Sequence, residues 1–238
     1  MHRSLGRLAL FVAAGSLVLS GCASAEDASE SGGDDSSGNS SGNSSGSEAV
    51  LTDKGGIVVT GADLSDDVGD TGSPVEVIVY EDFQCPYCGA LEESAGDYIE
   101  DALENGEITV EYRTVSFLDQ ASQNEFSSRA ANAALCVYDA AGASAFFDFH
   151  ETLFENQPDE GTAGPDDDQL TAYASDAGAD VAACIADRSM ADQVAATTKQ
   201  MQEDGVTGTP TVTVDGEQVE ITSETSVQDA IESAIGTV

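Results

Sequence analysis

Two stretches of apolar residues in the first half of the chain have the pattern of buried β-strands. In Val75–Tyr80 every residue but one is apolar, which is typical of a central strand covered on both faces. Ile108–Val115 has the β-branched and aromatic composition of a second strand. Between them we expect a helix from Pro86 to about Leu103, ended by an Asn-Gly pair at 105–106. A right-handed crossover would make the two strands parallel neighbours.

The second half of the chain predicts helices and then a hairpin. Residues from about 122 to 202 are alanine-rich with helical spacing, broken at Gly142, at 157–165 and at Gly178. The elements predicted after this helical insert are a strand at 211–214, a tight turn at 215–216, a strand at Gln218–Ile221, a cap at Ser223 or Thr225 and a last helix to about Ile235. The order β, α, β, helical insert, β, β, α indicates an α/β fold.

The N-terminal residues have the pattern of an export signal followed by a tether. Residues 1–21 hold a short basic start and an apolar run that is too short to span a bilayer. The run closes with Leu-Ser-Gly-Cys at 19–22, which resembles the bacterial lipobox and predicts lipidation of Cys22. Cleavage after the small residues 23–25 is the alternative, and it would secrete the protein instead. Residues 22–50 are rich in Ser, Gly and acid and predict a disordered tether, so the folded domain should span 51–238.

The charge balance limits the partners of the protein. The chain has 7 basic and 45 acidic residues and a net charge of −38. Such a surface repels polyanions, so we expect no nucleic-acid partner. Adaptation to salt explains the acidity more simply than a specific cationic partner does.

The motif Cys85-Pro86-Tyr87-Cys88 carries the strongest chemical signal. A C-x-x-C at the junction of a strand and a helix is a redox motif, because unpaired N–H groups at the helix start stabilise the first thiolate. Cys85 is therefore predicted to be the attacking sulfur that solvent reaches, with Cys88 shielded behind it and forming or resolving the disulfide. Half of a zinc site is the alternative, but no second close pair of ligands follows in the sequence.

Two motifs together resemble the DsbA-like thioredoxin family. Residues 81–88 read E-D-F-Q-C-P-Y-C, and residues 205–211, after the helical insert, read G-V-T-G-T-P-T. They are most similar to those of exported, membrane-anchored members found in actinobacteria, and the resemblance covers the chain from about Ile57 to its C-terminus. It implies a thioredoxin-like fold with a helical insertion between an N-terminal βαβ unit and a C-terminal ββα unit.

The resemblance also implies roles and partners. Pro210 would be the cis-proline that faces the cysteines, and the backbone of Thr209 would pair with an extended substrate. The substrates would be unfolded or reduced exported proteins, and a membrane quinone-linked oxidase would regenerate the enzyme. No metal or organic cofactor is expected.

Two positions depart from the family pattern. Thioredoxins carry a buried carboxylate six residues before the first cysteine, where this chain has Val79, so the proton acceptor of Cys88 is unassigned. Glu81 is a candidate for that role, although we interpret Glu81 and Asp82 as solvated charges at a strand end. Strongly oxidising members have a histidine between the cysteines, where this chain has Tyr87, so the motif does not give the redox potential.

Three more residues in the helical insert are candidates for a structural or chemical role. In an exported protein Cys136 and Cys184 predict a structural disulfide, the alternative being two buried thiols that pack as small apolar groups. His150 lies at helical spacing from Phe147 and Phe154, which favours a packed helix histidine over a catalytic one.

The sequence as a whole predicts a thiol–disulfide oxidoreductase anchored at the outer face of the cell membrane. Introduction of disulfides into exported proteins is the favoured direction. A reductase or isomerase on the same fold is the first alternative, and a non-enzymatic tethered binding lipoprotein is the second.

Overall fold

The fold is known from a computed structural model, which describes residues 51–68, 72–221 and 226–236. The predicted signal peptide, Cys22 and the tether lie outside these residues, as do the two predicted caps Ser223 and Thr225. Within the described part of the chain, no helix combines the length and the apolar character that a membrane crossing needs.

Five strands form one mixed sheet in the order β1-β3-β2-β4-β5. The strands are β1 Ile57–Val59, β2 Val75–Glu81, β3 Ile108–Thr114, β4 Thr211–Val214 and β5 Glu217–Gln218. β2 and β3 are parallel neighbours, as predicted, and β4 runs antiparallel to β2. Because β2 has a neighbour on each side and helices above it, its nearly continuous apolar sequence is buried.

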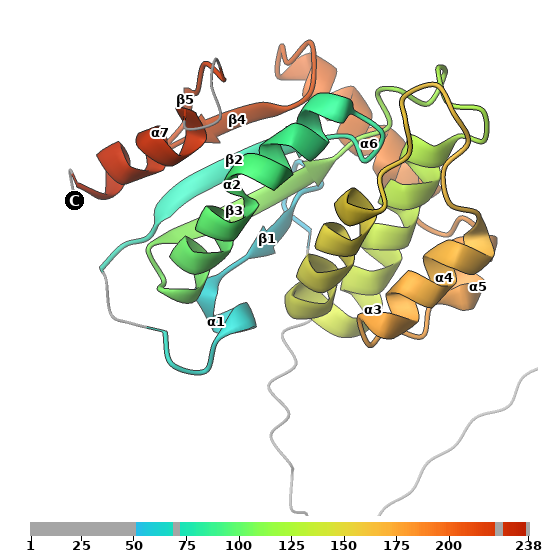
Figure 1. Cartoon of the computed structure of the whole chain (residues 1–238), viewed down its shortest axis with the longest axis horizontal. Coiled ribbons are helices and arrows are strands. Elements are labelled where there is room, and N and C mark those ends of the chain that lie inside the picture. Colours follow the sequence, from blue (N-terminus) through green and yellow to red (C-terminus); the bar gives the residue numbers. More distant parts are fainter. Residues whose placement is uncertain (1–50, 69–71, 222–225, 237–238) are drawn as a thin grey trace, which may run out of the picture. The chain divides into compact units, whose positions relative to one another are not determined.

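Seven helices surround the sheet in the described residues: α1 Gly61–Leu64, α2 Pro86–Glu104, α3 Phe126–Glu155, α4 Asp167–Asp176, α5 Ala182–Ala186, α6 Ala191–Glu203 and α7 Ser226–Ile235. In Figure 1, α2 and α7 lie in front of the sheet, where α2 packs on β3 and α7 packs on β2 and β4. The fainter α6 packs on β3 from behind. Helices α3 to α6 fall between β3 and β4, so the predicted fold class with its helical insertion is confirmed.

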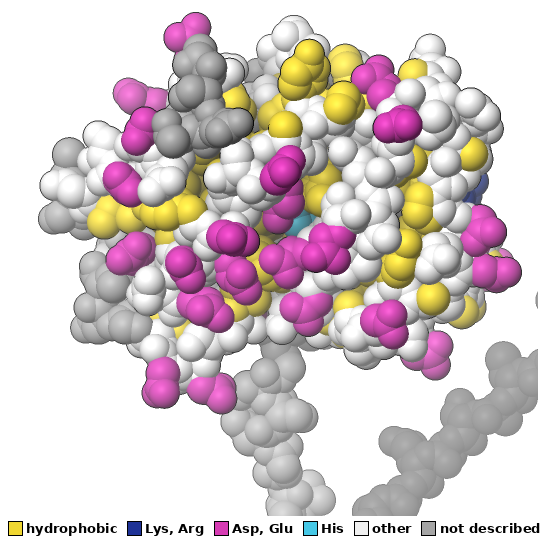
Figure 2. Space-filling model, in the orientation of Figure 1, with side chains coloured by type: hydrophobic (Ala, Val, Ile, Leu, Met, Phe, Trp, Pro, Cys, Tyr) yellow, Lys and Arg dark blue, Asp and Glu magenta, His cyan; other side chains and the backbone are white. Residues whose placement is uncertain are grey.

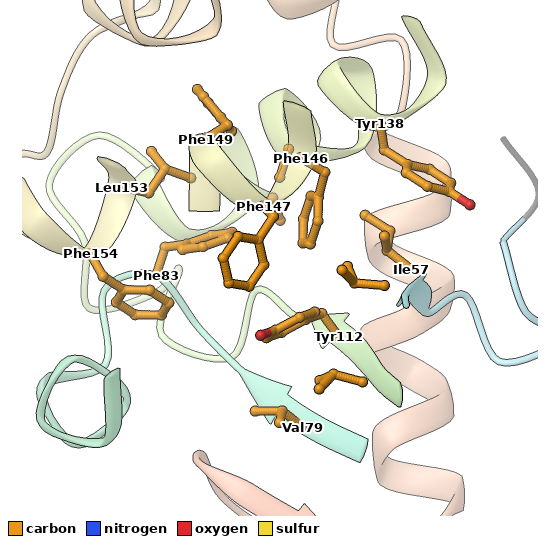
Figure 3. Close-up of a cluster of buried hydrophobic side chains, with 14 of the residues drawn as sticks. Ile57, Val79, Phe83, Tyr112, Tyr138, Phe146, Phe147, Phe149, Leu153 and Phe154 are labelled. Atoms are coloured by element: carbon orange, nitrogen blue, oxygen red, sulfur yellow. The ribbon is translucent and has the colours of Figure 1, made fainter. Parts of the chain in front are cut away.

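Aromatic side chains fill the core where the helical insert meets the sheet (Figure 3). Phe146 and Phe147 of α3 pack on Tyr112 of β3, with ring centroids 5.6 and 6.4 Å apart. Phe83, just after β2, packs on Phe154 at 5.2 Å. Because each ring removes about 150–250 Å² of mostly apolar surface from water, this cluster holds α3 against the end of β2.

The structure corrects the sequence prediction at both edges of the sheet. The short elements β1 and α1 were not predicted, because three or four residues carry too little periodicity to be recognised. The last strand is Glu217–Gln218 and not Gln218–Ile221. Asp215 and Gly216 have φ of 49° and 80° and form a two-residue turn, so pairing begins at once with Val214 opposite Glu217.

A disulfide and a glycine shape the helical insert. Cys136 of α3 and Cys184 of α5 are joined by a disulfide, with their Cα atoms 6.0 Å apart. The predicted break at Gly142 is confirmed, since this residue has φ 85° and ψ −172° inside α3. A residue with a side chain rarely adopts that conformation, so a glycine is required at this bend.

Candidate active site

Cys85 lies at the start of α2, as the C-x-x-C pattern predicts. It occupies the N-cap position with Pro86 as the first helical residue, and its carbonyl accepts hydrogen bonds from the N–H groups of Cys88 and Gly89. The Cys85 sulfur lies 3.3 Å from the carbonyl oxygen of Thr209. The side chains of Cys85 and Cys88 are also hydrogen-bonded to each other.

The two cysteines have opposite proton affinities. A hydrogen bond from the Cys88 side chain, supported by Thr209 and by the first backbone N–H groups of α2, outweighs burial and lowers the pKa of Cys85 to about 6. Burial raises the pKa of Cys88 well above 9.0, and its hydrogen bond to Cys85 adds to that shift. At neutral pH the reduced site therefore holds a Cys85 thiolate beside a Cys88 thiol.

The sulfur of Cys85 is less open to solvent than the sequence predicts. Cys85 is 4 % exposed and Cys88 is 2 % exposed, so both residues are buried. The loop before β4 covers Cys85, because Thr209 and Pro210 lie at the start of the strand that pairs with β2. Attack on a substrate disulfide therefore needs the substrate to fit closely against this loop.

The peptide bond between Thr209 and Pro210 is cis. β4 pairs with β2 from Thr211 onward, opposite Tyr80, so the proline comes directly before the paired strand. That register brings the loop beside the start of α2, which follows the end of β2. The structure thus brings Cys85 and Cys88 together with Thr209 and Pro210, which lie more than 120 residues further along the sequence.

Asp82 organises the loop between β2 and α2. One carboxylate oxygen accepts a hydrogen bond from the N–H of Gln84 at 2.9 Å, and the other accepts from the N–H of Leu118 at 2.8 Å. Gln157, after the end of α3, donates its side-chain amide to the carbonyl oxygens of Phe83 and Cys85. The active-site loop is therefore held from both sides by long-range hydrogen bonds.

The expectation that Glu81 and Asp82 are solvated is wrong. Glu81 is 3 % exposed and Asp82 is fully buried. Burial raises the pKa of Asp82, whose oxygens are satisfied by the backbone donors of the loop. The carboxylate of Glu81 lies 3.0 Å from Nε2 of His150 and is hydrogen-bonded to it. The helical insert supplies this partner, and a strand pattern alone carries no sign of it.

His150 is a packed helix histidine, as predicted, but it also carries a charge. It is fully buried, and its ring lies 4.6 Å from Tyr112, 5.0 Å from Phe154 and 5.7 Å from Phe83 between ring centroids. Burial lowers the pKa of His150, but the charges of Glu81 and Glu92 outweigh it and raise the pKa to about 9. The pair is therefore a buried ion pair at neutral pH.

An acidic groove of about 540 Å³ runs beside the active site between α2 and the end of α3. Five carboxylates line it: Glu92, Glu93, Asp97, Glu151 and Glu155. Pro86 also lines the groove, so it reaches the active-site motif itself. Figure 2 shows acidic side chains gathered on this face, over the helix α2 of Figure 1.

The zinc alternative has no support in the described residues. Cys136 and Cys184 are joined to each other and cannot complete a site with Cys85 and Cys88. Among the described residues, no group of three or more His, Cys, Asp or Glu side chains is placed to hold a metal ion.

The comparisons with known proteins agree with this geometry. A family model described as Thioredoxin matches residues 64–233. The reduced form of the disulfide bond oxidoreductase DsbG from Mycobacterium tuberculosis is 33 % identical with a TM-score of 0.65, over 76 % of this chain and 88 % of that one. Oxidised DsbA from the same organism is 32 % identical with a TM-score of 0.64, over 76 % of this chain and 93 % of that one.

The chain belongs to the DsbA-like thioredoxin family. The family resemblance of the two sequence motifs is therefore confirmed, and the domain is a thiol–disulfide oxidoreductase that carries out dithiol–disulfide exchange. Among curated proteins, the serine/threonine-protein kinase PknE of Mycobacterium tuberculosis is 30 % identical over 136 residues, which are 56 % of this chain. This chain spans only 24 % of the kinase's length.

Sequence reasoning missed the contacts that support this DsbA-like site from a distance. The Glu81–His150 pair and the hydrogen bonds of Gln157 join residues about 70 positions apart. The available signals were an acid at the end of a mostly apolar strand and a histidine among phenylalanines, and each pattern taken singly has a simpler explanation.

Proposed function

We propose that the protein introduces disulfide bonds into exported proteins. The observation that carries this proposal is the contrast between the two sulfurs, with the pKa of Cys85 at about 6 and that of Cys88 well above 9.0. A stabilised Cys85 thiolate stabilises the reduced form of the enzyme, and this makes its disulfide a better oxidant.

The proposed reaction proceeds in two exchanges. A substrate thiolate attacks the Cys85 sulfur, the Cys85–Cys88 bond breaks, and Cys88 leaves with the electron pair and is protonated. A second substrate thiolate then attacks the substrate sulfur of the mixed disulfide, and Cys85 leaves as its stable thiolate. The substrate gains one disulfide and the enzyme gains two electrons.

The surface around Cys85 supports a polypeptide substrate. Tyr87 is 74 % exposed and Phe117 is 44 % exposed, and the loop that carries Phe117 is joined to the active-site loop through Asp82. These rings would hold apolar side chains of an unfolded substrate beside the sulfur, and the backbone of Thr209 would pair with its extended chain.

Export and anchoring complete the proposal. The Leu-Ser-Gly-Cys sequence supports lipidation of Cys22 and a position at the outer face of the cell membrane, where a membrane quinone-linked oxidase would reoxidise the enzyme. The variant Cys22→Ser tests the anchor. It should move the protein from the membrane fraction to the surrounding medium or periplasm, or leave it unprocessed. Normal processing with unchanged membrane association would refute the lipid anchor.

The reductase or isomerase is the second candidate, and one position favours it. Tyr87 stands where strong oxidants of the family have a histidine, so the Cys85 thiolate lacks a neighbouring imidazolium.

The reduction potential separates the two directions. The full-length protein is equilibrated with reduced and oxidised glutathione, and the fraction of Cys85–Cys88 disulfide is measured by alkylation and mass spectrometry. An oxidase should give a potential above the thioredoxin value of about −270 mV. A potential at or below that value, with the enzyme mostly reduced in intact cells, would favour the reductase.

A further inference from the structure

Tyr80 of β2 contacts both ends of the loop that carries the cis-proline. This loop, residues 205–210, joins α6 to β4. At its start, the Tyr80 hydroxyl donates a hydrogen bond to the carboxylate of Asp204 at 2.6 Å, and Val206 packs against the small apolar cluster that includes Tyr80. At its end, Tyr80 pairs with Thr211, the first residue of β4. One residue of the central strand therefore fixes the loop at its two ends.

The middle of the loop has little packing that would fix its shape. At Gly205 and Gly208, no described atom outside the neighbouring residues lies within 4 Å of the place that a Cβ would take. Glycine also loses more backbone entropy on ordering than any other residue. The shape of the loop therefore depends on its ends. The position of the Thr209 carbonyl oxygen, which lies 3.3 Å from the Cys85 sulfur, depends on them too.

Asp204 belongs to a network of charged groups that joins β3 to the end of α6. Its carboxylate accepts hydrogen bonds from Lys54 at 2.8 and 2.9 Å and lies 3.6 Å from the guanidinium of Arg113. Arg113 also donates to the hydroxyl of Tyr80, and two of its N–H groups donate to Glu111 at 2.7 Å. Burial, followed by the hydrogen bond to Asp204, raises the pKa of Tyr80 to about 12. The hydroxyl therefore keeps the proton that it donates to Asp204.

The composition of this network favours a role beyond stability. It holds two of the seven basic residues in a chain that has 45 acidic ones. The side chains of Arg113 and Glu111 are 7 % and 8 % exposed, so both charges lose most of their hydration. A buried ion pair of this kind contributes little to stability, but it can fix one arrangement of the groups around it. Here the arrangement that it fixes includes the start of the loop.

We propose that Asp204 is a positioning residue that holds Thr209 in place for an extended polypeptide substrate. The network with Arg113 and Tyr80 fixes the start of the loop, the pairing of β4 fixes its end, and the backbone of Thr209 is thereby held beside Cys85. The inference rests on the proposed pairing of the substrate with Thr209. It adds a residue that acts on the substrate only through the loop.

The test compares a substrate that has a peptide backbone with one that has none. Oxidised full-length protein is reduced by an unstructured peptide with two cysteines or by dithiothreitol, and the loss of the Cys85–Cys88 bond is followed by alkylation and mass spectrometry. In Asp204→Asn the reaction with the peptide should be about tenfold slower, through a higher half-saturating peptide concentration, because a displaced Thr209 loses one or two backbone hydrogen bonds. The reaction with dithiothreitol should be as fast or faster, since it needs no pairing and the loop then covers the sulfur less closely.

Glu203→Gln is the matched control. Glu203 pairs with Lys199 on the same helix, and the two side chains are 53 % and 73 % exposed. This variant removes the same charge one position away, so any effect of net charge on the peptide is equal in the two variants. Both of its rates should stay at the unsubstituted level. The same peptide deficit in Glu203→Gln would refute the positioning role. An Asp204→Asn protein in which both reactions slow equally, or in which neither changes, would refute it as well.

Tyr80→Phe replaces Asp204→Asn if that variant does not fold. It removes only the hydroxyl that joins Arg113 to Asp204, and it should show the same selective loss with the peptide. A Tyr80→Phe protein that reacts with both substrates at the unsubstituted rates would refute the role of the network.

A peptide that is N-methylated beside its cysteines separates this inference from the proposed function. It lacks the N–H donors of a β-bridge, so it should react with the unsubstituted protein about as slowly as the ordinary peptide reacts with Asp204→Asn. If N-methylation changes nothing in the unsubstituted protein, the proposed pairing with Thr209 is refuted, and the inference with it. If N-methylation slows the unsubstituted protein and Asp204→Asn reacts normally with the ordinary peptide, only the inference is refuted.

Discussion

Cys85 and Cys88 are the same residue type on one helical turn, and their surroundings alone make them different. Cys85 lies at the helix start, where N–H groups and the neighbouring thiol stabilise its anion. Cys88 lies one turn further in, where burial and the charge of Cys85 oppose ionisation. Cys85 is therefore the attacking sulfur and Cys88 the resolving one because Cys85 lies at the start of α2 and Cys88 lies buried one turn further into it.

Alkylation of the reduced protein should label Cys85 first, with a half-maximal rate near pH 6. The variant Cys88→Ala removes the hydrogen bond that contributes most to this shift, so it should move the titration of Cys85 toward the free-thiol value of about 8.5. Iodoacetamide labelling across the pH range, followed by peptide mass mapping, measures both. Earlier labelling of Cys88, or a Cys85 that titrates like a free thiol, would reverse the assigned roles.

Tyr87→His should make the enzyme a stronger oxidant. Tyr87 is exposed, so the substitution should leave folding unchanged. A histidine cation beside the thiolate would lower the pKa of Cys85 further, and each pKa unit corresponds to about 30 mV in the potential of a two-electron couple. Glutathione equilibration gives the potential, and Tyr87→Phe is the control that adds no charge. An unchanged potential in Tyr87→His would show that this side chain lies too far from the sulfur to act on it.

At the level of elements, long periodic segments were predictable and short or distant ones were not. β2 and α2 follow from an apolar run and from a proline at a helix start. The short elements β1 and α1 were missed, because three or four residues show no recognisable periodicity. The bounds of β5 were displaced, because the turn before it decides which residues pair. The Glu81–His150 pair was missed for another reason. It depends on how α3 packs against the end of β2, and tertiary packing has no local signal.

The disulfide between α3 and α5 should stabilise the helical insert without affecting exchange. Replacing Cys136 and Cys184 together by alanine should lower the free energy of unfolding by about 2–4 kcal/mol, since the bond closes a long loop. Urea unfolding measures this loss, and the glutathione reaction of Cys85 should keep its rate. Mild reductant should open the Cys85–Cys88 bond first, because the catalytic bond is the labile one. Mass mapping that finds either cysteine free in the oxidised protein would remove this bond from the structure.

For the whole molecule, the excess of acid means that stability depends on pH and salt together. The net charge of −38 makes the folded chain repel itself, and salt screens exposed charges but affects buried ones much less. Three groups with shifted pKa values add a pH dependence of their own. They are Asp204 in the ion pair with Lys54, Glu151 in the groove and His150 in the core.

The melting temperature should therefore be highest in mildly acidic solution and should fall as the pH rises to 9. His150 has a folded pKa raised from 6.5 to about 9, so its contribution is complete below 6.5 and is lost as the pH rises through 9. Burial raises the pKa of Glu151 from 4.5 to about 7, so its contribution is complete below 4.5 and is lost as the pH rises to about 7. For Asp204, burial is outweighed by hydrogen bonds from Lys54 and Tyr80, which lower its pKa to about 2, so its contribution is lost only below pH 4. Thermal melts of the oxidised protein, in which Cys85 does not titrate, are run from pH 4 to 9 in about 1 M salt, where the Debye length is about 3 Å; this salt suppresses the surface repulsion and retains the buried pair. His150→Gln should flatten the alkaline part of this curve. A melting temperature that rises from pH 6 to 9 in high salt would show that His150 is not held as a cation in the folded protein.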